Sequence, residues 1–169
     1  VVEKIKPDVV VHLAALPLAN LSNTYSQEAV SSIIETTTNF LEILKKNKFN
    51  GKFIYTSSSM VYGEFNNKIV TEESPTKPIS IYGSAKLAGE IITKGFCESF
   101  SLKYSIIRPS AVYGPTDVNR RVVQIFMENA FRGKKIVLNG PQSKIDFTYI
   151  ADLVQGYEKV INSHRSENQ

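Results

Sequence analysis

The sequence predicts an α/β fold built on a parallel sheet, and its hydrophobic patterning is the reason. Short apolar runs alternate with longer segments whose apolar residues recur every three or four positions, which is the spacing of one helix face. The short runs lack polar alternation, as expected for strands buried on both faces. Because strands that alternate with helices pair in parallel through right-handed crossovers, we expect one sheet covered by helices.

Each predicted element has its own signal. The strands are the continuous apolar runs at residues 9–13, 53–56, 104–107 and 136–138. The helices are the periodic segments at residues 26–46, 80–100, 119–131 and 151–161. Ser80 is a good N-cap residue for the second helix, and residues 64–79, with two prolines, form a long loop. Residues 1–6 resemble the last turn of a helix, so we expect the sequence to be a piece of a longer protein.

Composition narrows the class of protein. The 169 residues, 42% hydrophobic and 21% charged, exclude a disordered or collagen-like chain. No apolar run approaches the ~20 residues of a membrane span, so we predict no membrane segment. The net charge of +4 comes from scattered residues, which is weak support for nucleic acid binding, and we predict none. A single cysteine favours a reducing, cytoplasmic location.

Two residues of potentially reactive types have structural interpretations. His12 lies on a predicted buried strand and is interpreted as a core histidine. Cys97 lies inside a predicted helix without an obvious base nearby and is interpreted as inert. No cluster of histidine, cysteine and carboxylate residues has metal-ligand spacing in the sequence, so we predict no metal site.

The residues that follow each strand are the place to look for chemistry. In open parallel sheets, ligands bind beyond the carboxyl ends of the strands. Here those segments are residues 12–15, 56–59 and 108–111. The second of them, Thr56-Ser57-Ser58-Ser59, offers four small hydroxyl groups at one strand end. They could bind a substrate oxygen, or they could form a turn that caps backbone groups.

Tyr82 and Lys86 form a candidate acid–base pair. Their spacing of four places them on one face of the predicted helix. A phenol has a pKa of about 10, and a neighbouring ammonium favours its ionised form, which could then take a proton from an alcohol. The alternative is a surface tyrosine packed on a lysine stem, since about one such pair is expected by chance. The hydroxyl-rich strand end upstream favours the catalytic interpretation.

Five segments together carry a family resemblance. They are residues 7–15 (PDVVVHLAA), 55–63 (YTSSSMVYG), 82–90 (YGSAKLAGE), 108–115 (RPSAVYGP) and 146–152 (DFTYIAD). In this order and spacing the chain resembles the extended short-chain dehydrogenase/reductase family, the NAD-dependent sugar-nucleotide epimerases and dehydratases. The resemblance implies the C-terminal part of a Rossmann-like, doubly wound parallel sheet, plus part of a small substrate-binding region. It implies that residues 1–115 form the second half of the NAD-binding domain, and residues 116–169 a partial substrate-binding region with a returning helix.

The resemblance also implies a role for individual residues. Tyr82 would be the catalytic acid and base, Lys86 would lower its pKa and hold the nicotinamide ribose, and Ser58 would complete the triad. The cofactor, NAD with NADP as the alternative, would contact Leu13, Ala14, Ala15, Thr56, Ser57, Tyr82, Lys86, Pro109 and Ser110. A nucleotide-sugar substrate would contact Ser58, Ser59, Met60, Tyr82, Arg120 and Arg121.

The chain departs from the family pattern at the cofactor site. The glycine-rich turn that takes the NAD pyrophosphate at a helix N-terminus is absent from these 169 residues. We therefore expect this chain alone to bind NAD weakly or not at all, and to be inactive by itself.

Further departures concern the substrate. Many members have asparagine at the places of Ile33 and Ala111 and arginine at the place of Ile145, where two of the three contact phosphate. Arg120 and Arg121 could replace those contacts, or they form a solvated basic pair. Dehydratases of the family carry an acidic pair where Ser59 and Met60 stand, which argues against dehydration.

The expected function is therefore NAD-dependent epimerisation of a nucleotide sugar through a transient keto intermediate. The alternatives are a reductase, dehydrogenase or dehydratase of the same family, or a non-catalytic binding protein on the same fold. Members of the family typically dimerise through two helices, which here are residues 26–46 and 80–100. We expect a homodimer of the full-length protein, against the alternative that both helices are buried within one subunit.

Overall fold

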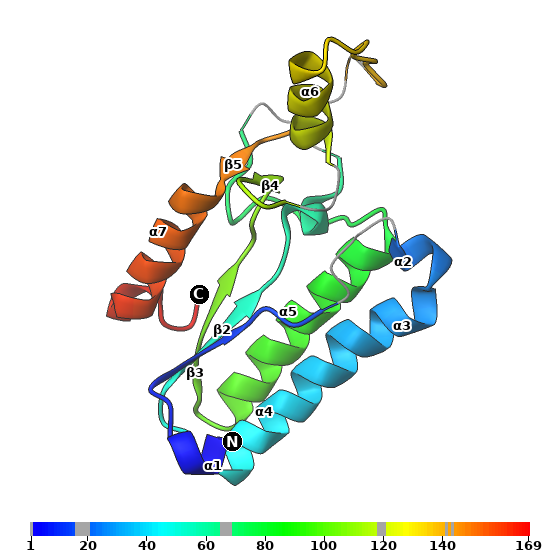
Figure 1. The fold of residues 1–169 in the computed structure, drawn as a ribbon. Helices are drawn as coiled ribbons and strands as arrows, with labels where there is room; N and C mark the ends of the chain where they lie inside the picture. Colours follow the sequence, from blue (N-terminus) through cyan, green and yellow to red (C-terminus); the bar gives the residue numbers. More distant parts are fainter. Residues whose placement is uncertain (1, 16–20, 65–68, 118–120, 141, 143) are drawn as a thin grey trace.

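A three-stranded parallel sheet forms the centre of the molecule. The structure is a computed structural model that describes residues 2–15, 21–64, 69–117, 121–140, 142 and 144–169. Strands β1 (Val9–His12), β2 (Lys52–Thr56) and β3 (Lys103–Ile107) lie in the order β1-β2-β3 (Figure 1). The register pairs Val9 with Lys52 and Lys52 with Lys103. The predicted strands at these three places and their parallel pairing are confirmed.

Two long helical segments cover one face of the sheet. The first runs from α2 (Leu21–Thr24) into α3 (Ser26–Val30), a π-helical turn η1 (Ser31–Glu35) and α4 (Thr36–Lys46). The second is α5 (Ile81–Ser99), which lies beside it (Figure 1). Ser80 caps α5, as predicted, because its hydroxyl accepts a hydrogen bond from the Gly83 backbone N–H at 3.1 Å. Upstream of the sheet, α1 (Val2–Ile5) confirms the predicted helical turn.

The core lies between this helical layer and the sheet. It includes Leu41 and Leu44 of α4, Phe53 and Tyr55 of β2, and Cys97 of α5, all fully buried. Burial raises the pKa of the Cys97 thiol to about 12, which confirms the interpretation of an inert cysteine.

Helix α7 (Ile150–Asn162) covers the opposite face of the sheet (Figure 1). Its C-terminal end is tied to the start of β2, because the Lys52 ammonium donates to the carbonyl oxygens of Val160 at 2.8 Å and Ser163 at 2.6 Å. After a 3-10 turn, η3 (His164–Ser166), the chain runs along the edge of β3, where the Asn168 N–H donates to the Tyr104 carbonyl.

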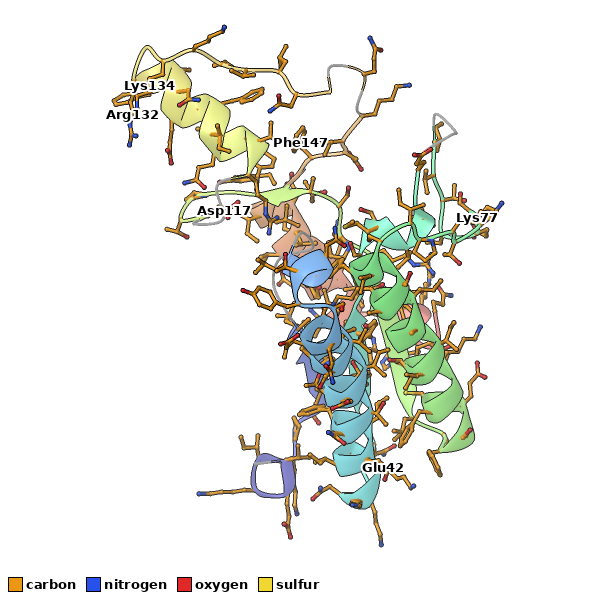
Figure 2. All side chains as sticks on the ribbon, turned by 90° about the vertical axis from the view of Figure 1, so that its right-hand side faces the viewer. Glu42, Lys77, Asp117, Arg132, Lys134 and Phe147 are labelled. Carbon is orange, nitrogen blue, oxygen red and sulfur yellow. The ribbon has the colours of Figure 1, made fainter. Side chains whose placement is uncertain are left out.

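A smaller lobe lies beyond the carboxyl ends of the strands. It contains a two-stranded parallel sheet, β4 (Val112–Tyr113) with β5 (Thr148–Tyr149), and helix α6 (Val122–Phe131). Side chains around α6 project outward, as Arg132 and Lys134 do in Figure 2. Phe131 is 94% exposed.

One predicted strand is wrong. Residues 136–138 form an exposed irregular segment rather than a strand. The β-branched residues there have local strand preference, but strand preference expresses itself only against a paired neighbour, and this segment pairs with no strand among the described residues. The strands that do form in this lobe, β4 and β5, have two residues each and leave no periodic signal. The predicted helices at residues 119–131 and 151–161 correspond to α6 and α7.

Candidate active site

The exits of the strands meet at one edge of the sheet. The Ser57 N–H donates to the Ile107 carbonyl at 2.7 Å, and the Ser59 N–H donates to the Pro109 carbonyl at 2.9 Å. These bonds hold the segment after β2 against the segment after β3. At the end of β1, Leu13 is 64% exposed and Ala14 is also exposed. The cofactor and substrate residues that the family resemblance implies on these three segments are thus neighbours in space.

Only some hydroxyl groups of the turn after β2 cap backbone groups. Ser58 is the N-cap of the 3-10 helix η2 (Ser59–Tyr62), and its hydroxyl accepts from the Met60 N–H at 3.2 Å. The Ser59 hydroxyl donates to the Ser110 hydroxyl at 3.2 Å. The Ser57 hydroxyl is buried and lacks a hydrogen-bond partner among the described residues. The capping interpretation therefore applies to Ser58, while Ser57 keeps an unused polar group at the strand exit.

The first turn of α5 packs directly on this serine turn. A Cβ atom at Gly83 would lie 2.6 Å from the Met60 carbonyl oxygen, so only glycine allows this approach. Tyr82 precedes Gly83, and the Lys86 amine lies 5.8 Å from the centre of the Tyr82 ring. Tyr82 and Lys86 therefore lie on the same side of α5, next to the segment that carries Ser58 and Met60.

The Lys86 amine is held by the end of β2. Lys86 is 4% exposed, and its amine donates to the Thr56 carbonyl at 2.8 Å. The amine also lies 5.4 Å from the centre of the Tyr55 ring. Burial disfavours the charged form and lowers the pKa of Lys86 to about 8. The side chain can therefore exist in both protonation states near neutral pH.

The expected effect of Lys86 on Tyr82 is not found. Burial raises the pKa of the Tyr82 phenol above its ordinary value, and the group that partly opposes this rise is the Arg121 guanidinium. The Lys86 amine donates its hydrogen bond to the Thr56 carbonyl and lies 5.8 Å from the centre of the Tyr82 ring.

Arg121 lies at the start of α6 and faces the site from the smaller lobe. Its side chain is exposed, and one guanidinium N–H donates to the Val112 carbonyl at 3.1 Å. Its electrostatic effect on Tyr82 places it on the same side of the molecule as the acid–base pair. The other predicted arginine, Arg120, lies outside the described residues.

A partly buried ion pair between Arg108 and Glu90 was not predicted. Arg108 donates through Nε and Nη2 to the two carboxylate oxygens of Glu90, at 2.9 and 2.7 Å, and through Nη1 to the Tyr62 hydroxyl at 2.8 Å. These bonds join α5, β3 and η2. The sequence contains a signal for this pair. Glu90 lies four residues after Lys86, on the same face of the helix, and Arg108 directly follows β3.

His12 has the structural role predicted for it. It is 8% exposed, its Nε2 lies 3.1 Å from the Thr37 hydroxyl, and its ring stacks on Phe40 at 5.8 Å. Because Thr37 gives its own proton to the Ile33 carbonyl, His12 is assigned as the Nε2–H tautomer. Burial and the charge of Lys86 lower the pKa of His12. No group of three potential metal ligands occurs among the described residues.

An open groove of about 1600 Å³ runs along β3 and α5. Its lining includes Ser59, Ser110 and Arg108 but neither Tyr82 nor Lys86. The groove therefore adjoins the acid–base pair without containing it.

Within the described part of the chain, no helix has the length and apolar character needed to cross a membrane.

Comparison with known proteins decides the family. The NAD dependent epimerase/dehydratase family matches the chain over residues 1–169. The chain belongs to this family. The resemblance inferred from the five sequence segments is thereby confirmed.

Relatives of this family member include both epimerases and dehydratases. An uncharacterized UDP-glucose epimerase of Bacillus subtilis (strain 168) is 33% identical over 158 residues, which are 91% of this chain and 49% of that protein. The dTDP-D-glucose 4,6-dehydratase of Homo sapiens is 29% identical over 157 residues, 92% of this chain and 45% of that enzyme. The chain thus spans about half the length of these curated relatives.

A solved structure confirms the fold class. The UDP-glucuronic acid 4-epimerase of Bacillus cereus, in complex with UDP-glucuronic acid and NAD, superposes with a TM-score of 0.86 at 31% identity. The match covers 98% of this chain and 53% of that structure. The chain therefore has the architecture of part of an NAD-dependent epimerase.

Proposed function

We propose that the protein containing this chain is an enzyme that epimerises a nucleotide sugar with bound NAD, through a transient keto intermediate. The observation that carries the proposal is the placement of Tyr82 and Lys86 on one side of α5, against the turn that carries Ser58. The names of the relatives and the ligands of the Bacillus cereus structure support the substrate class.

The acid–base step uses groups of this chain. The Tyr82 hydroxyl exchanges a proton with the carbinol hydroxyl of the sugar, and we propose that the Ser58 hydroxyl, which caps η2, shares that hydrogen bond. Bound NAD would supply the acceptor, and then the donor, of the hydride of the same carbon. Since the pKa of Tyr82 is raised in this structure, the step needs additional positive charge near the phenol, and Lys86 and Arg121 are the candidates.

The residues present fit one end of the cofactor. The exposed Leu13 and Ala14, the unpartnered Ser57 hydroxyl and the buried Lys86 amine lie at the strand exits. We propose that these residues, with Ala15, Pro109 and Ser110, hold the nicotinamide end. Thr56 would contact the nicotinamide end through its backbone, because its hydroxyl is hydrogen-bonded to Tyr157. The chain contains no glycine-rich turn for the pyrophosphate.

Arg121 is the proposed phosphate contact of the substrate. Its side chain is exposed and its charge acts on Tyr82, and a guanidinium suits phosphate oxygens in two-pronged contacts. We also propose that residues 1–115 form the cofactor half and residues 116–169 the substrate-side lobe with the returning helix. The proposed cytoplasmic location rests on the single, buried cysteine.

A dehydratase of the same family is the second candidate. The human relative is a dTDP-D-glucose 4,6-dehydratase. Against this function, Ser59 and Met60 offer no acid to protonate a leaving hydroxyl. Product analysis with dTDP-glucose separates the two functions, because dehydration removes water and epimerisation conserves mass.

The decisive experiment is Tyr82→Phe in the full-length protein, with UDP-glucose and UDP-glucuronate as probes. We expect turnover to fall by about 10²–10⁴-fold, because the general acid and base is removed. Tyr25→Phe, at an exposed tyrosine distant in sequence from the site, is the matched control and should keep its turnover. If Tyr82→Phe stays within about tenfold of the parent, Tyr82 is not the acid and base.

We propose that the full-length protein forms a homodimer through the helices at residues 26–46 and 80–100. These helices lie side by side (Figure 1), and they carry the exposed side chains Ile43 and Ile91, the latter exposed by 65%. Covering such apolar area is a common reason for association. Ile91→Glu should convert the dimer to a monomer in sedimentation equilibrium, while Leu138→Glu, on the smaller lobe, should not. A protein that is monomeric at the start contradicts the proposal.

A further inference from the structure

Helix α7 reaches the end of β2 through one tyrosine. The hydroxyl of Tyr157 lies 2.7 Å from the hydroxyl of Thr56. Thr56 is the residue whose backbone carbonyl accepts the Lys86 amine at 2.8 Å. We propose that Tyr157 is a positioning residue, which fixes the Lys86 amine by holding Thr56 in place. The positioning role itself does not depend on the proposed function. Its importance for catalysis rests on the proposed function.

The geometry of β2 explains why Thr56 can connect two helices. A side chain in a strand points to one face of the sheet, while the carbonyl lies near the plane of the sheet. The Thr56 side chain therefore meets α7 on one face, and its carbonyl remains available to Lys86 from the α5 side.

The position of α7 is fixed independently of this contact. Lys52, at the start of β2, holds the C-terminal end of α7 through the carbonyls of Val160 and Ser163. Tyr157 and Val160 are three residues apart and so share one face of the helix. The helix is thus bonded to both ends of β2, and Tyr157 is directed to Thr56 by a framework that does not involve the active site.

The groups around the Lys86 amine define the readout. Tyr55 faces it from β2 and Tyr82 from its own helix. His12 faces it from β1, and burial together with the charge of Lys86 lowers the pKa of His12. Burial of the amine keeps its pKa at about 8. If Thr56 loosens, the amine loses the carbonyl acceptor that stabilises its charged form, and its pKa falls further below the ordinary value.

The test is the titration of Lys86 in Tyr157→Phe, followed by NMR of lysines labelled at the ε-carbon, with Lys86→Arg assigning the signal. We expect the midpoint to fall below about 8, while Tyr149→Phe leaves it unchanged. Hydrogen-exchange protection of α5 and β2 amides checks that the fold is kept. An unchanged midpoint in a folded Tyr157→Phe protein overturns the proposal.

A double variant separates action through Thr56 from a general effect of α7. Thr56→Val removes the hydroxyl that Tyr157 contacts but leaves the backbone carbonyl that Lys86 uses. If Tyr157 acts through Thr56, the double variant shows the same midpoint as either single variant. Additive changes mean that Tyr157 acts by another route and contradict the proposal.

Activity measurements keep this proposal distinct from the proposed function. In the full-length protein, Tyr157→Phe should move the pH profile of kcat together with the Lys86 midpoint and leave KM unchanged. If Tyr82→Phe retains turnover, the epimerase proposal fails, while the NMR result for Lys86 still decides the role of Tyr157. A kcat profile that does not follow the midpoint removes Lys86 from the catalytic step.

Discussion

At the scale of the residue, the site depends on a buried amine. Lys86 is nearly inaccessible, and its hydrogen-bond acceptor is a backbone carbonyl at the end of β2. The sequence predicts that Lys86 lies beside Tyr82, since a spacing of four fixes a common helix face. It could not predict where the amine points, because any residue type supplies a carbonyl. The unexpected direction of the pKa of Tyr82 follows from the burial of its phenol.

The charge state of Lys86 should make stability depend on pH. Its folded pKa of about 8 lies below the ordinary 10.5, so between these values the unfolded chain binds more protons than the folded one. The free energy of unfolding therefore rises with pH, by about 1.5 kcal/mol from about pH 8 to about pH 9.5, and falls back as the pH returns to 8.

Urea unfolding at several pH values measures this rise. Lys86→Met should remove it, whereas Lys94→Met, at an exposed lysine on the same helix, should retain it. The range ends near pH 9.5 because the pKa values of Tyr82 and Tyr157 are raised by burial, and tyrosine ionisation lowers stability at higher pH. If the free energy of unfolding rises with pH as steeply in Lys86→Met as in the parent chain, the pKa of Lys86 is not lowered in the folded state.

At the scale of the element, helix α7 is attached to the sheet by polar contacts as well as by packing. Lys52 is 5% exposed. Its ammonium donates hydrogen bonds to carbonyls at the C-terminal end of α7, where the helix dipole is negative. The sequence predicts the helix from its periodicity. It does not predict the anchor, which joins residues more than a hundred positions apart.

Removing this anchor should destabilise the fold. Lys52→Met leaves the carbonyls of Val160 and Ser163 without their charged donor, at a cost of about 2 kcal/mol. For a chain of this length the Tm should fall by roughly 4–8 °C in thermal unfolding followed by circular dichroism. Lys46→Met, at an exposed position at the end of α4, should change the Tm by less than about 2 °C. Equal effects of the two variants contradict the anchor.

The elements of the smaller lobe were predicted least well. The central strands and the two long helices follow from continuous apolar runs and a helical period, which tertiary contacts reinforce. In the smaller lobe, the residues at 136–138 are apolar yet exposed by 40–67%. Strands β4 and β5 exist because Val112 meets Thr148 across the lobe, and that pairing is a non-local event that no short window of sequence contains.

At the scale of the whole molecule, the chain carries the proposed acid–base groups, and its sequence contains no glycine-rich turn for the cofactor phosphates. We expect isothermal titration calorimetry of NAD into this 169-residue chain to give no binding tighter than the millimolar range, about −4 kcal/mol. The full-length protein, measured in the same way, is the positive control. A low-micromolar dissociation constant for the 169-residue chain would refute this expectation and show that the strand exits alone hold the dinucleotide.

The contact between Gly83 and Met60 has a consequence for engineering. Replacing glycine by alanine inside a helix ordinarily strengthens the helix by about 1 kcal/mol, so Gly83 looks like an easy position to improve. A methyl group there would meet a carbonyl oxygen at 2.6 Å and wedge the helix away from the neighbouring turn. The missing methyl group thus sets how closely α5 approaches the turn that carries Ser58, and alanine at this position would cost the fold that contact.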